Sequence, residues 1–161
     1  MRTAIITVST SVAAGRTEDR SGVELAGLAT AAGAEVVARE VVSDDREAIE
    51  AALRRHVSGG ASLIFTTGGT GLTRDDVTPE ATKAVIDRDA PGFAEAMRAE
   101  SLRHTPLGIL TRGVSGIAQR SLIINFPGNP KAIRELFPVI APTLEHVVTT
   151  LHHEGGPTPG H

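Results

Sequence analysis

A glycine- and threonine-rich stretch near the middle of the chain carries the residue types best suited to phosphate chemistry. Residues 66–71 read Thr-Thr-Gly-Gly-Thr-Gly, and Asp75 and Asp76 follow a few positions later. Glycines let the backbone approach an anion closely and offer it N–H groups, and threonine hydroxyls add further donors. Two carboxylates beside an anion pocket are repulsive unless a metal ion or a proton mediates between them. The stretch therefore favours a phosphorylated ligand bound together with a divalent cation.

The elements on either side of this stretch put it at the end of a strand. Residues 62–65 form a short, continuous apolar run between glycines, which predicts a buried parallel strand. Pro79 suits a first helical turn, and Thr78 is expected as the N-cap of a helix that runs to about Arg88. Ligands of open α/β sheets bind in the crevice at the carboxyl ends of the strands. We therefore expect the glycine loop to face a ligand.

The rest of the chain alternates strands and helices, which predicts an α/β fold with a mostly parallel sheet. Further strands are expected at residues 3–8, 35–42, 107–111 and 121–126. The connection over residues 112–120 is short enough for a hairpin, so part of the sheet is expected to be antiparallel. The other elements expected are a polar loop over residues 9–22, helices ending at Gly33 and near Gly59, a helix over 93–103, and a long final helix bent at Pro138 and Pro142.

The composition limits the possible functions. The chain of 161 residues fits one domain, expected over residues 1–154, with a disordered tail at 155–161. A net charge of −3, with four phenylalanines as the only aromatic residues, argues against a nucleic-acid partner or an anionic membrane surface. The absence of cysteine excludes disulfides, thiolate metal ligands and cysteine nucleophiles. No leader and no membrane-spanning run is recognised, so a cytoplasmic protein without a membrane partner is expected.

Four motifs in a fixed order carry a resemblance to a known family. They are Thr-Gly-Gly-Thr-Gly at residues 67–71, Asp-Val-Thr-Pro at 76–79, Thr-Arg-Gly at 111–113 and Leu-Ile-Ile-Asn-Phe-Pro-Gly-Asn-Pro at 122–130. With this spacing, nearly the whole chain resembles the Mog/MoaB family of molybdenum cofactor biosynthesis. The resemblance implies a three-layer α/β/α fold and a homotrimer. It also implies a molybdopterin adenylyltransferase that uses ATP and Mg²⁺, releases pyrophosphate and prepares the pterin for a downstream molybdate-insertion protein.

The resemblance also assigns site residues by matching position. Asp44 and Asp76 fall on the family's two functional acids, and we expect both to place Mg²⁺ and nucleotide as catalytic and metal-binding residues. Thr111 and Ser121 fall on hydroxyl positions near the substrate phosphate, although the family often has serine where Thr111 stands. The residues expected to bind substrate or nucleotide are Gly68, Gly69, Thr70, Gly71, Thr111, Ser115, Ser121, Pro127, Gly128, Asn129 and Pro130.

Structural alternatives stay open for several of these residues. Asp44 could simply cap the helix beginning near residue 45, since aspartate is a favoured N-cap, and the glycines could form only a tight turn. Asp19 and Ser21 are expected to cap the first helix rather than to face the pocket. Arg74 and Arg112, in the site loops, are the arginines best placed to meet a phosphate.

The function has an alternative as well, a non-catalytic molybdopterin-binding module. The presence of both Asp44 and Asp76 favours the enzyme, because a pure binder gains nothing from paired acids beside an anionic ligand. The Walker pattern GxxxxGK[ST] is absent, so a P-loop enzyme is excluded.

Overall fold

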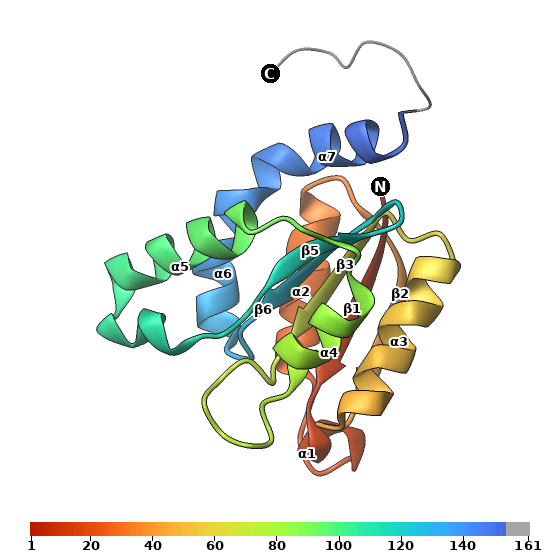
Figure 1. The fold of residues 1–161 in the computed structure, drawn as a ribbon. Coiled ribbons are helices and arrows are strands. Elements are labelled where there is room, and N and C mark those ends of the chain that lie inside the picture. Colours follow the sequence, from red (N-terminus) through yellow and green to blue (C-terminus); the bar gives the residue numbers. More distant parts are fainter. Residues whose placement is uncertain (154–161) are drawn as a thin grey trace.

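The fold is built around one mixed sheet of six strands (Figure 1), seen in a computed structural model that describes residues 1–153. Across the sheet the strands run in the order β2-β1-β3-β6-β5-β4. Neighbours among β2, β1, β3 and β6 are parallel, whereas the β6–β5 and β5–β4 pairs are antiparallel. The bounds are β1 (Arg2–Val8), β2 (Glu35–Val42), β3 (Leu63–Thr67), β4 (Arg88–Asp89), β5 (Ser115–Ala118) and β6 (Ser121–Phe126). The expected α/β class with an antiparallel portion is confirmed.

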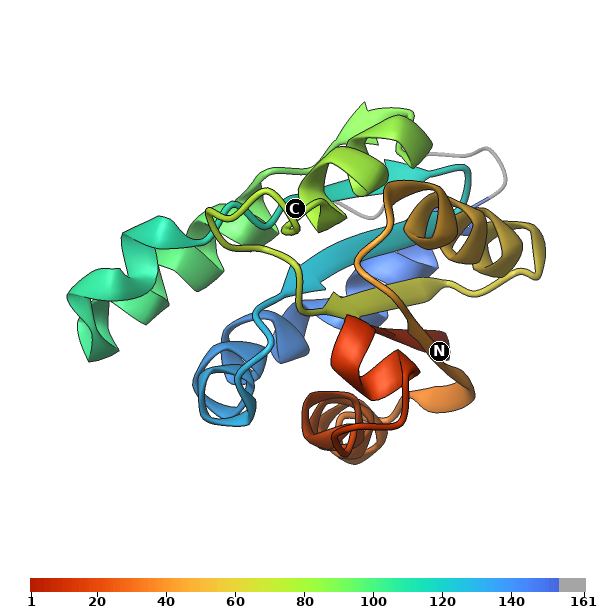
Figure 2. The same cartoon turned by 90° about the horizontal axis from the view of Figure 1, so that it is seen from below.

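Helices cover both faces of this sheet, which gives the three expected layers (Figure 2). α2 (Arg20–Ala31) and α6 (Pro130–Ile140) pack on one face, and α3 (Arg46–Ser58) and α4 (Thr78–Val85) pack on the other. The other helices are α1 (Thr10–Ala13), α5 (Gly92–His104), η1 (Pro106–Leu110), η2 (Ala141–Thr143) and α7 (Leu144–Leu151). Among residues 1–153, no helix has the length and apolar character needed to cross a membrane.

Two hydrophobic cores follow from the alternation of side chains along the central strands. On the α2–α6 face, Phe65 and Phe126 meet edge to face with ring centroids 5.6 Å apart, and Phe137 of α6 packs against both. On the opposite face, Ile64 and Ile123 belong to the core formed with α3. This packing holds β1, β3 and β6 side by side, so that their carboxyl ends lie at one edge of the sheet.

The prediction of a strand at residues 107–111 is wrong, because this segment contains the short 3-10 helix η1. Pro106 occupies its first turn. Gly108 lies so close to α5 that an added Cβ would be 2.7 Å from the Ser101 hydroxyl oxygen. The antiparallel neighbour of β6 is β5 instead, which lies inside the expected connection 112–120. A hairpin is present, but its first strand comes later in the chain than expected.

Some helix ends also differ from expectation. The loop expected over residues 9–22 contains α1 and the start of α2, and α4 stops at Val85 rather than near Arg88. The final helix is interrupted as expected, because α6, η2 and α7 follow one another past Pro138 and Pro142. The tail expected at 155–161 lies outside the described residues.

Candidate active site

The ends of three parallel strands, β1, β3 and β6, meet around Gly68. Its N–H donates to the Phe126 carbonyl (3.1 Å), and its φ of 97° lies in the region that favours glycine. A Cβ at this position would lie 2.3 Å from the Val8 carbonyl oxygen, and a Cβ on Gly128 would lie 3.3 Å from the Gly68 Cα. The glycines therefore allow an approach between strand ends that a side chain at position 68 would prevent.

Thr78 closes the glycine loop onto the start of α4. Its hydroxyl donates to the Gly68 carbonyl (2.9 Å), and its N–H donates to the Gly69 carbonyl (3.1 Å). Gly69 has a φ of 67°, and a Cβ there would lie 2.3 Å from the Thr78 hydroxyl oxygen. The expectation that Thr78 is the N-cap of this helix is wrong, since Val77 holds that position without a side-chain hydrogen bond. The Thr78 hydroxyl fixes the loop instead.

Three consecutive backbone N–H groups in this loop, those of Gly69, Thr70 and Gly71, have no acceptor within residues 1–153. Thr70 is nevertheless largely buried, with 6% of its surface exposed. Successive N–H groups that point to no protein acceptor suit an anion, because backbone N–H groups carry partial positive charge. The loop thus has the donors that its glycine-rich sequence predicts.

Asp76 lies beside this loop, in a turn that its own side chain helps to form. Its Oδ2 accepts the N–H (3.0 Å) and the hydroxyl (2.8 Å) of Thr73. A Cβ on Gly71 would lie 2.8 Å from the same Oδ2, so a side chain there would displace the carboxylate. The third glycine of the loop is therefore explained by the position of Asp76.

Asp44 is held in the same manner on the other side of the strand ends. Its Oδ2 accepts the N–H and the hydroxyl of Thr10, both at 2.9 Å, and its own N–H donates to the Thr10 hydroxyl oxygen (3.0 Å). The alternative that Asp44 caps α3 is wrong, because Asp45 caps that helix by accepting the Ala48 N–H (2.9 Å). Asp44 instead ties the end of β2 to the start of α1.

Both acids keep one carboxylate oxygen, Oδ1, that accepts no hydrogen bond from the described part of the chain. Residues 1–153 contain no cluster of three or more histidine, cysteine or acidic side chains that could hold a metal ion alone. Mg²⁺ commonly binds through one or two carboxylates together with substrate phosphates and water. The free Oδ1 of Asp44 or of Asp76 could therefore contribute a ligand to a magnesium ion that is carried largely by a nucleotide.

A hollow of about 290 Å³ opens where the strand ends meet, lined in part by Ser9, Arg20, Ser21, Gly68 and Gly128. Ser21 was expected to cap α2 but lines this hollow. Asp19 does cap α2 as expected. Its carboxylate accepts the Gly22 N–H (2.9 Å) and the Thr7 hydroxyl (3.0 Å).

The Pro127–Pro130 turn joins the group of loops at this edge. The Pro127 carbonyl accepts the Thr67 hydroxyl (2.8 Å), which links the ends of β3 and β6. Asn129 is the N-cap of α6 and accepts the Lys131 N–H (2.9 Å), while Pro130 begins the helix and lines the hollow. The turn thus starts a helix and borders the hollow at once.

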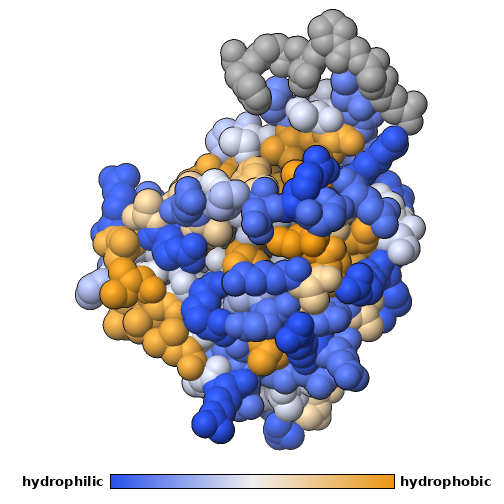
Figure 3. Space-filling model, viewed as in Figure 1, coloured by the Kyte–Doolittle hydropathy of each residue, from blue (hydrophilic) through white to orange (hydrophobic). Residues whose placement is uncertain are grey.

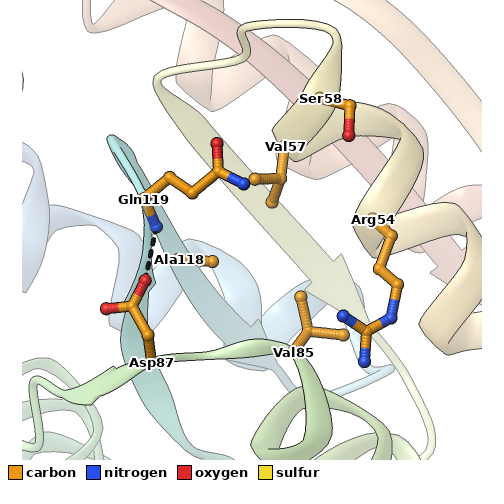
Figure 4. A pocket seen from close by; sticks show the side chains of 7 residues that line it. All are labelled: Arg54, Val57, Ser58, Val85, Asp87, Ala118 and Gln119. Atoms are coloured by element: carbon orange, nitrogen blue, oxygen red, sulfur yellow. Dashed lines mark hydrogen bonds between the residues drawn. The ribbon is translucent and has the colours of Figure 1, made fainter.

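Ser121 does not join this group, because it begins β6 and so lies at the opposite edge of the sheet. Only 2% of its surface is exposed, and its hydroxyl donates to the Ala61 carbonyl (2.6 Å). It borders another hollow, of about 580 Å³, and a neighbouring one of about 210 Å³ is lined by Asp87 and Gln119 (Figure 4). Neither of these two hollows is lined by the glycine loop, whereas the hollow at the strand ends is lined by Gly68; Asp44 and Asp76 line none of the three.

Ser115 and Thr111 also make structural contacts. The buried Ser115 hydroxyl donates to the Ala90 carbonyl (2.6 Å) and accepts the Ala94 N–H (3.1 Å), which fixes the start of α5. The Thr111 carbonyl accepts a hydrogen bond from Arg98 (3.1 Å), and its hydroxyl oxygen lies 3.4 Å from the Gly113 nitrogen. Thr111 stays half-buried next to Arg112, which contacts the glycine loop directly.

Arg112, expected to meet a phosphate, is engaged with the protein. Its guanidinium donates to the Gly71 carbonyl (2.8 Å), the Asp76 carbonyl (2.6 Å) and the Glu80 carboxylate. Hydrogen bonding to Arg112 lowers the pKa of the Glu80 carboxyl, and the same contact raises the pKa of Arg112. Arg74 is exposed to solvent.

Thr10 and Thr73 are the site residues that the sequence did not indicate. Thr10 presents a backbone N–H and a hydroxyl to the Oδ2 of Asp44, and Thr73 does the same for Asp76. Thr73 stands three residues before Asp76, and Ser/Thr-x-x-acid is the spacing at which a carboxylate reaches back to a backbone N–H, so this signal was available. Thr10 is 34 residues from Asp44, so only the fold brings the two together.

Comparison with known proteins identifies the family to which this site belongs. Residues 4–146 match the family described as "Probable molybdopterin binding domain". The chain belongs to this family. The resemblance expected from the four motifs is therefore confirmed for nearly the whole chain.

Curated relatives of the chain include named enzymes. The chain is similar to the molybdopterin adenylyltransferase of Helicobacter pylori strain J99, with 46% identity over 110 residues, which are 68% of this chain and 62% of the relative. It is 48% identical over 96 residues to the Escherichia coli K12 molybdopterin adenylyltransferase, covering 59% of this chain and 49% of the relative. The matched part spans about half to three fifths of the length of these relatives.

Solved structures of the family match over a larger share. The molybdopterin biosynthesis enzyme MoaB from Thermus thermophilus superposes with a TM-score of 0.88 at 40% identity, covering 98% of this chain and 99% of that one. The tungsten cofactor synthesizing protein MoaB from Pyrococcus furiosus gives a TM-score of 0.86 at 30% identity, covering 94% and 97%. The three-layer fold is thus shared with these two solved structures.

Proposed function

We propose that this chain is a molybdopterin adenylyltransferase of molybdenum cofactor biosynthesis. It transfers the adenylyl group of ATP to the phosphate of molybdopterin with Mg²⁺ and releases pyrophosphate. The observation that carries the proposal is the glycine loop with Asp76 beside it: within residues 1–153, the Gly69, Thr70 and Gly71 N–H groups have no acceptor, and the Oδ1 atoms of Asp76 and of Asp44 accept no hydrogen bond. The names of the adenylyltransferase relatives support the same reaction.

The reaction needs positioning and charge neutralisation more than covalent catalysis. An oxygen of the molybdopterin phosphate forms a bond to the α-phosphorus of ATP, and the bond from that phosphorus to the bridging oxygen breaks as pyrophosphate leaves. Both reactants are anions, so the N–H groups of Gly69, Thr70 and Gly71 would hold one phosphate in place. Asp44 and Asp76 would hold Mg²⁺, which supplies the positive charge between the two reactants when it is bound.

The direct test is to incubate the purified chain with molybdopterin, ATP and Mg²⁺ and to measure pyrophosphate and adenylylated pterin. Asp76→Asn should lower turnover at least about a hundredfold with little change in melting temperature, because it removes transition-state stabilisation without opening a cavity. Asp75→Asn is the matched control, since Asp75 is exposed and makes no hydrogen bond within residues 1–153. Near-normal turnover in the Asp76 variant would contradict the catalytic role.

The same experiment separates the enzyme from a non-catalytic binder. The chain has no tryptophan and no tyrosine, so a bound pterin is visible in the near ultraviolet against little background. Saturable pterin binding without any adenylylated product, in the presence of ATP and Mg²⁺, would leave only the binding module. No pterin binding at all would reject both functions.

The proposal includes assembly into a homotrimer and delivery of the product to a downstream molybdate-insertion protein. Half of the exposed large apolar side chains among the described residues lie on α5 and η1, namely Leu102, Leu107, Ile109 and Leu110. They form the apolar surface at the lower left of Figure 3, called the η1 surface below. We take a second copy of this chain as its occupant, since a homotrimer must bury a surface of each subunit and exposed apolar patches mark such contacts.

A further inference from the structure

Arg112 is distant from the glycine loop in sequence but holds that loop at several points. Its backbone N–H donates to the Thr70 carbonyl (2.8 Å). In its side chain, Nε donates to the Gly71 carbonyl (2.8 Å) and Nη2 to the Asp76 carbonyl (2.6 Å). Nη1 donates to Glu80 in the first turn of α4. One side chain therefore fixes both ends of the segment between Gly71 and Asp76.

The guanidinium is suited to this task because its donors lie in one rigid plane. Three acceptors on separate residues can be satisfied together only if their spacing matches that plane. A lysine ammonium carries one nitrogen on a flexible stem, so it cannot reproduce the same spacing. All three guanidinium nitrogens of Arg112 are engaged with the protein, which argues against a direct phosphate contact.

Contacts inside the segment set its local shape but not its position. The Asp76 N–H donates to the Thr73 carbonyl (3.2 Å), and the Asp76 Oδ2 accepts from Thr73. These bonds join residues three apart, so they do not anchor the turn to the rest of the site. Thr73 is exposed, and Leu72 beside it is 65% exposed, so core packing does not restrain this part of the loop. The contacts of Arg112 relate the turn to the rest of the site.

We propose that Arg112 is a positioning residue for adenylyl transfer: it sets the spacing between Gly71 and Asp76 and so places the Asp76 carboxylate beside the unengaged N–H groups of the loop. The inference rests on the proposed function, because the effect on the rate presupposes that Asp76 acts in this reaction. A displacement of about 1 Å at a catalytic group can lower the rate about a hundredfold. Glu80 assists by holding the guanidinium in its plane.

Steady-state kinetics of Arg112→Lys test the proposal. We expect kcat to fall about ten- to hundredfold while KM for ATP and molybdopterin changes less than about threefold, since alignment rather than binding is lost. Arg112→Gln should show the same changes in kcat and KM, because both variants lose the planar set of guanidinium donors. Arg103→Lys is the control, since Arg103 is exposed on α5 and within residues 1–153 its one ion pair is with Glu100. Raised KM with kcat intact, restored by lysine but not by glutamine, would indicate a phosphate ligand and overturn the proposal.

Amide hydrogen exchange in the free protein gives a second readout that needs no activity. The hydrogen-bonded N–H groups of Thr73 and Asp76 should exchange faster in Arg112→Lys than in the wild-type chain, because the turn that they close opens more often once its anchor is lost. The strands should be unchanged, and Arg103→Lys should match the wild type. Glu80→Gln, which keeps the side-chain shape, should show a smaller increase in the same exchange rates. It replaces Arg112→Lys as the test variant if Arg112→Lys does not fold. Unchanged exchange and a kcat within about twofold of wild type would overturn the inference. A wild-type chain that forms no adenylylated pterin would reject the proposed function, while the exchange data would still decide whether Arg112 holds the loop.

Discussion

At the scale of single residues, Gly68 shows most directly how the site is made. Its φ is positive and its missing side chain leaves room for the Val8 carbonyl, so both the backbone conformation and the close packing require glycine at this position. Gly68→Ala should lower the free energy of unfolding by more than about 2 kcal/mol, because the left-handed conformation alone costs about 1–2 kcal/mol and the backbone clash adds to it.

Gly15 provides the matched control for this measurement. Its φ of 73° is also positive, but no atom lies within 4 Å of an added Cβ. Gly15→Ala should therefore cost only about 1–2 kcal/mol in chemical denaturation. Equal losses in the two variants would mean that the strand ends are not in close contact at Gly68.

The sequence predicted the single residues whose role is local and missed those whose role depends on the fold. The glycine loop and Asp76 follow one another in the chain, so their sequence pattern alone predicted that they lie together. Ser121 illustrates the opposite case. A hydroxyl on the first residue of a strand lies at the amino end, and the Ala61 carbonyl that it meets is 60 residues away. Nothing in the local sequence distinguishes such a buried structural serine from a ligand-binding one.

At the scale of elements, the hairpin of β5 and β6 is the part that hydrophobic pattern alone could not assign. The apolar run at 107–111 looked like a strand, but it is exposed on the η1 surface, whereas the less apolar β5 is paired in the sheet. The two strands are joined at Gln119, the only non-glycine residue with a positive φ (56°) within residues 1–153. A hairpin turn that would favour glycine at this position therefore gave no signal in the sequence.

This turn yields a prediction of increased stability. Gln119→Gly should raise the free energy of unfolding by up to about 1 kcal/mol, because glycine adopts the positive φ without strain. The backbone N–H at position 119 would still donate to Asp87 (2.7 Å), the bond that lowers the pKa of that carboxyl (Figure 4). Gln119→Ala, which keeps the strain, should show no gain in the same thermal or chemical denaturation. A gain of equal size in the alanine variant would trace the effect to the side chain instead.

At the scale of the whole molecule, the site and the η1 surface are joined by a short piece of chain. η1 ends at Leu110, and Arg112 follows two residues later to contact the loop of Asp76. A subunit that covers η1 would therefore restrain the segment from which Arg112 extends. The proposed trimer would therefore affect the position of Arg112, although every site residue described above comes from one chain.

The assembly proposal is tested by placing a charge on the η1 surface. Ile109 is 65% exposed, and Ile109→Asp should convert a trimer into monomers of 16.7 kDa in sedimentation equilibrium, because a buried unpaired carboxylate opposes association. Val23→Asp is the control, since Val23 on α2 is 54% exposed and lies outside the η1 surface. A wild-type chain that sediments as a monomer would contradict the trimer. If Ile109→Asp yields monomers with full adenylylation turnover, the site is complete within one chain. A loss of turnover that recovers with protein concentration would instead mean that the covered η1 surface keeps Arg112 and its loop in place.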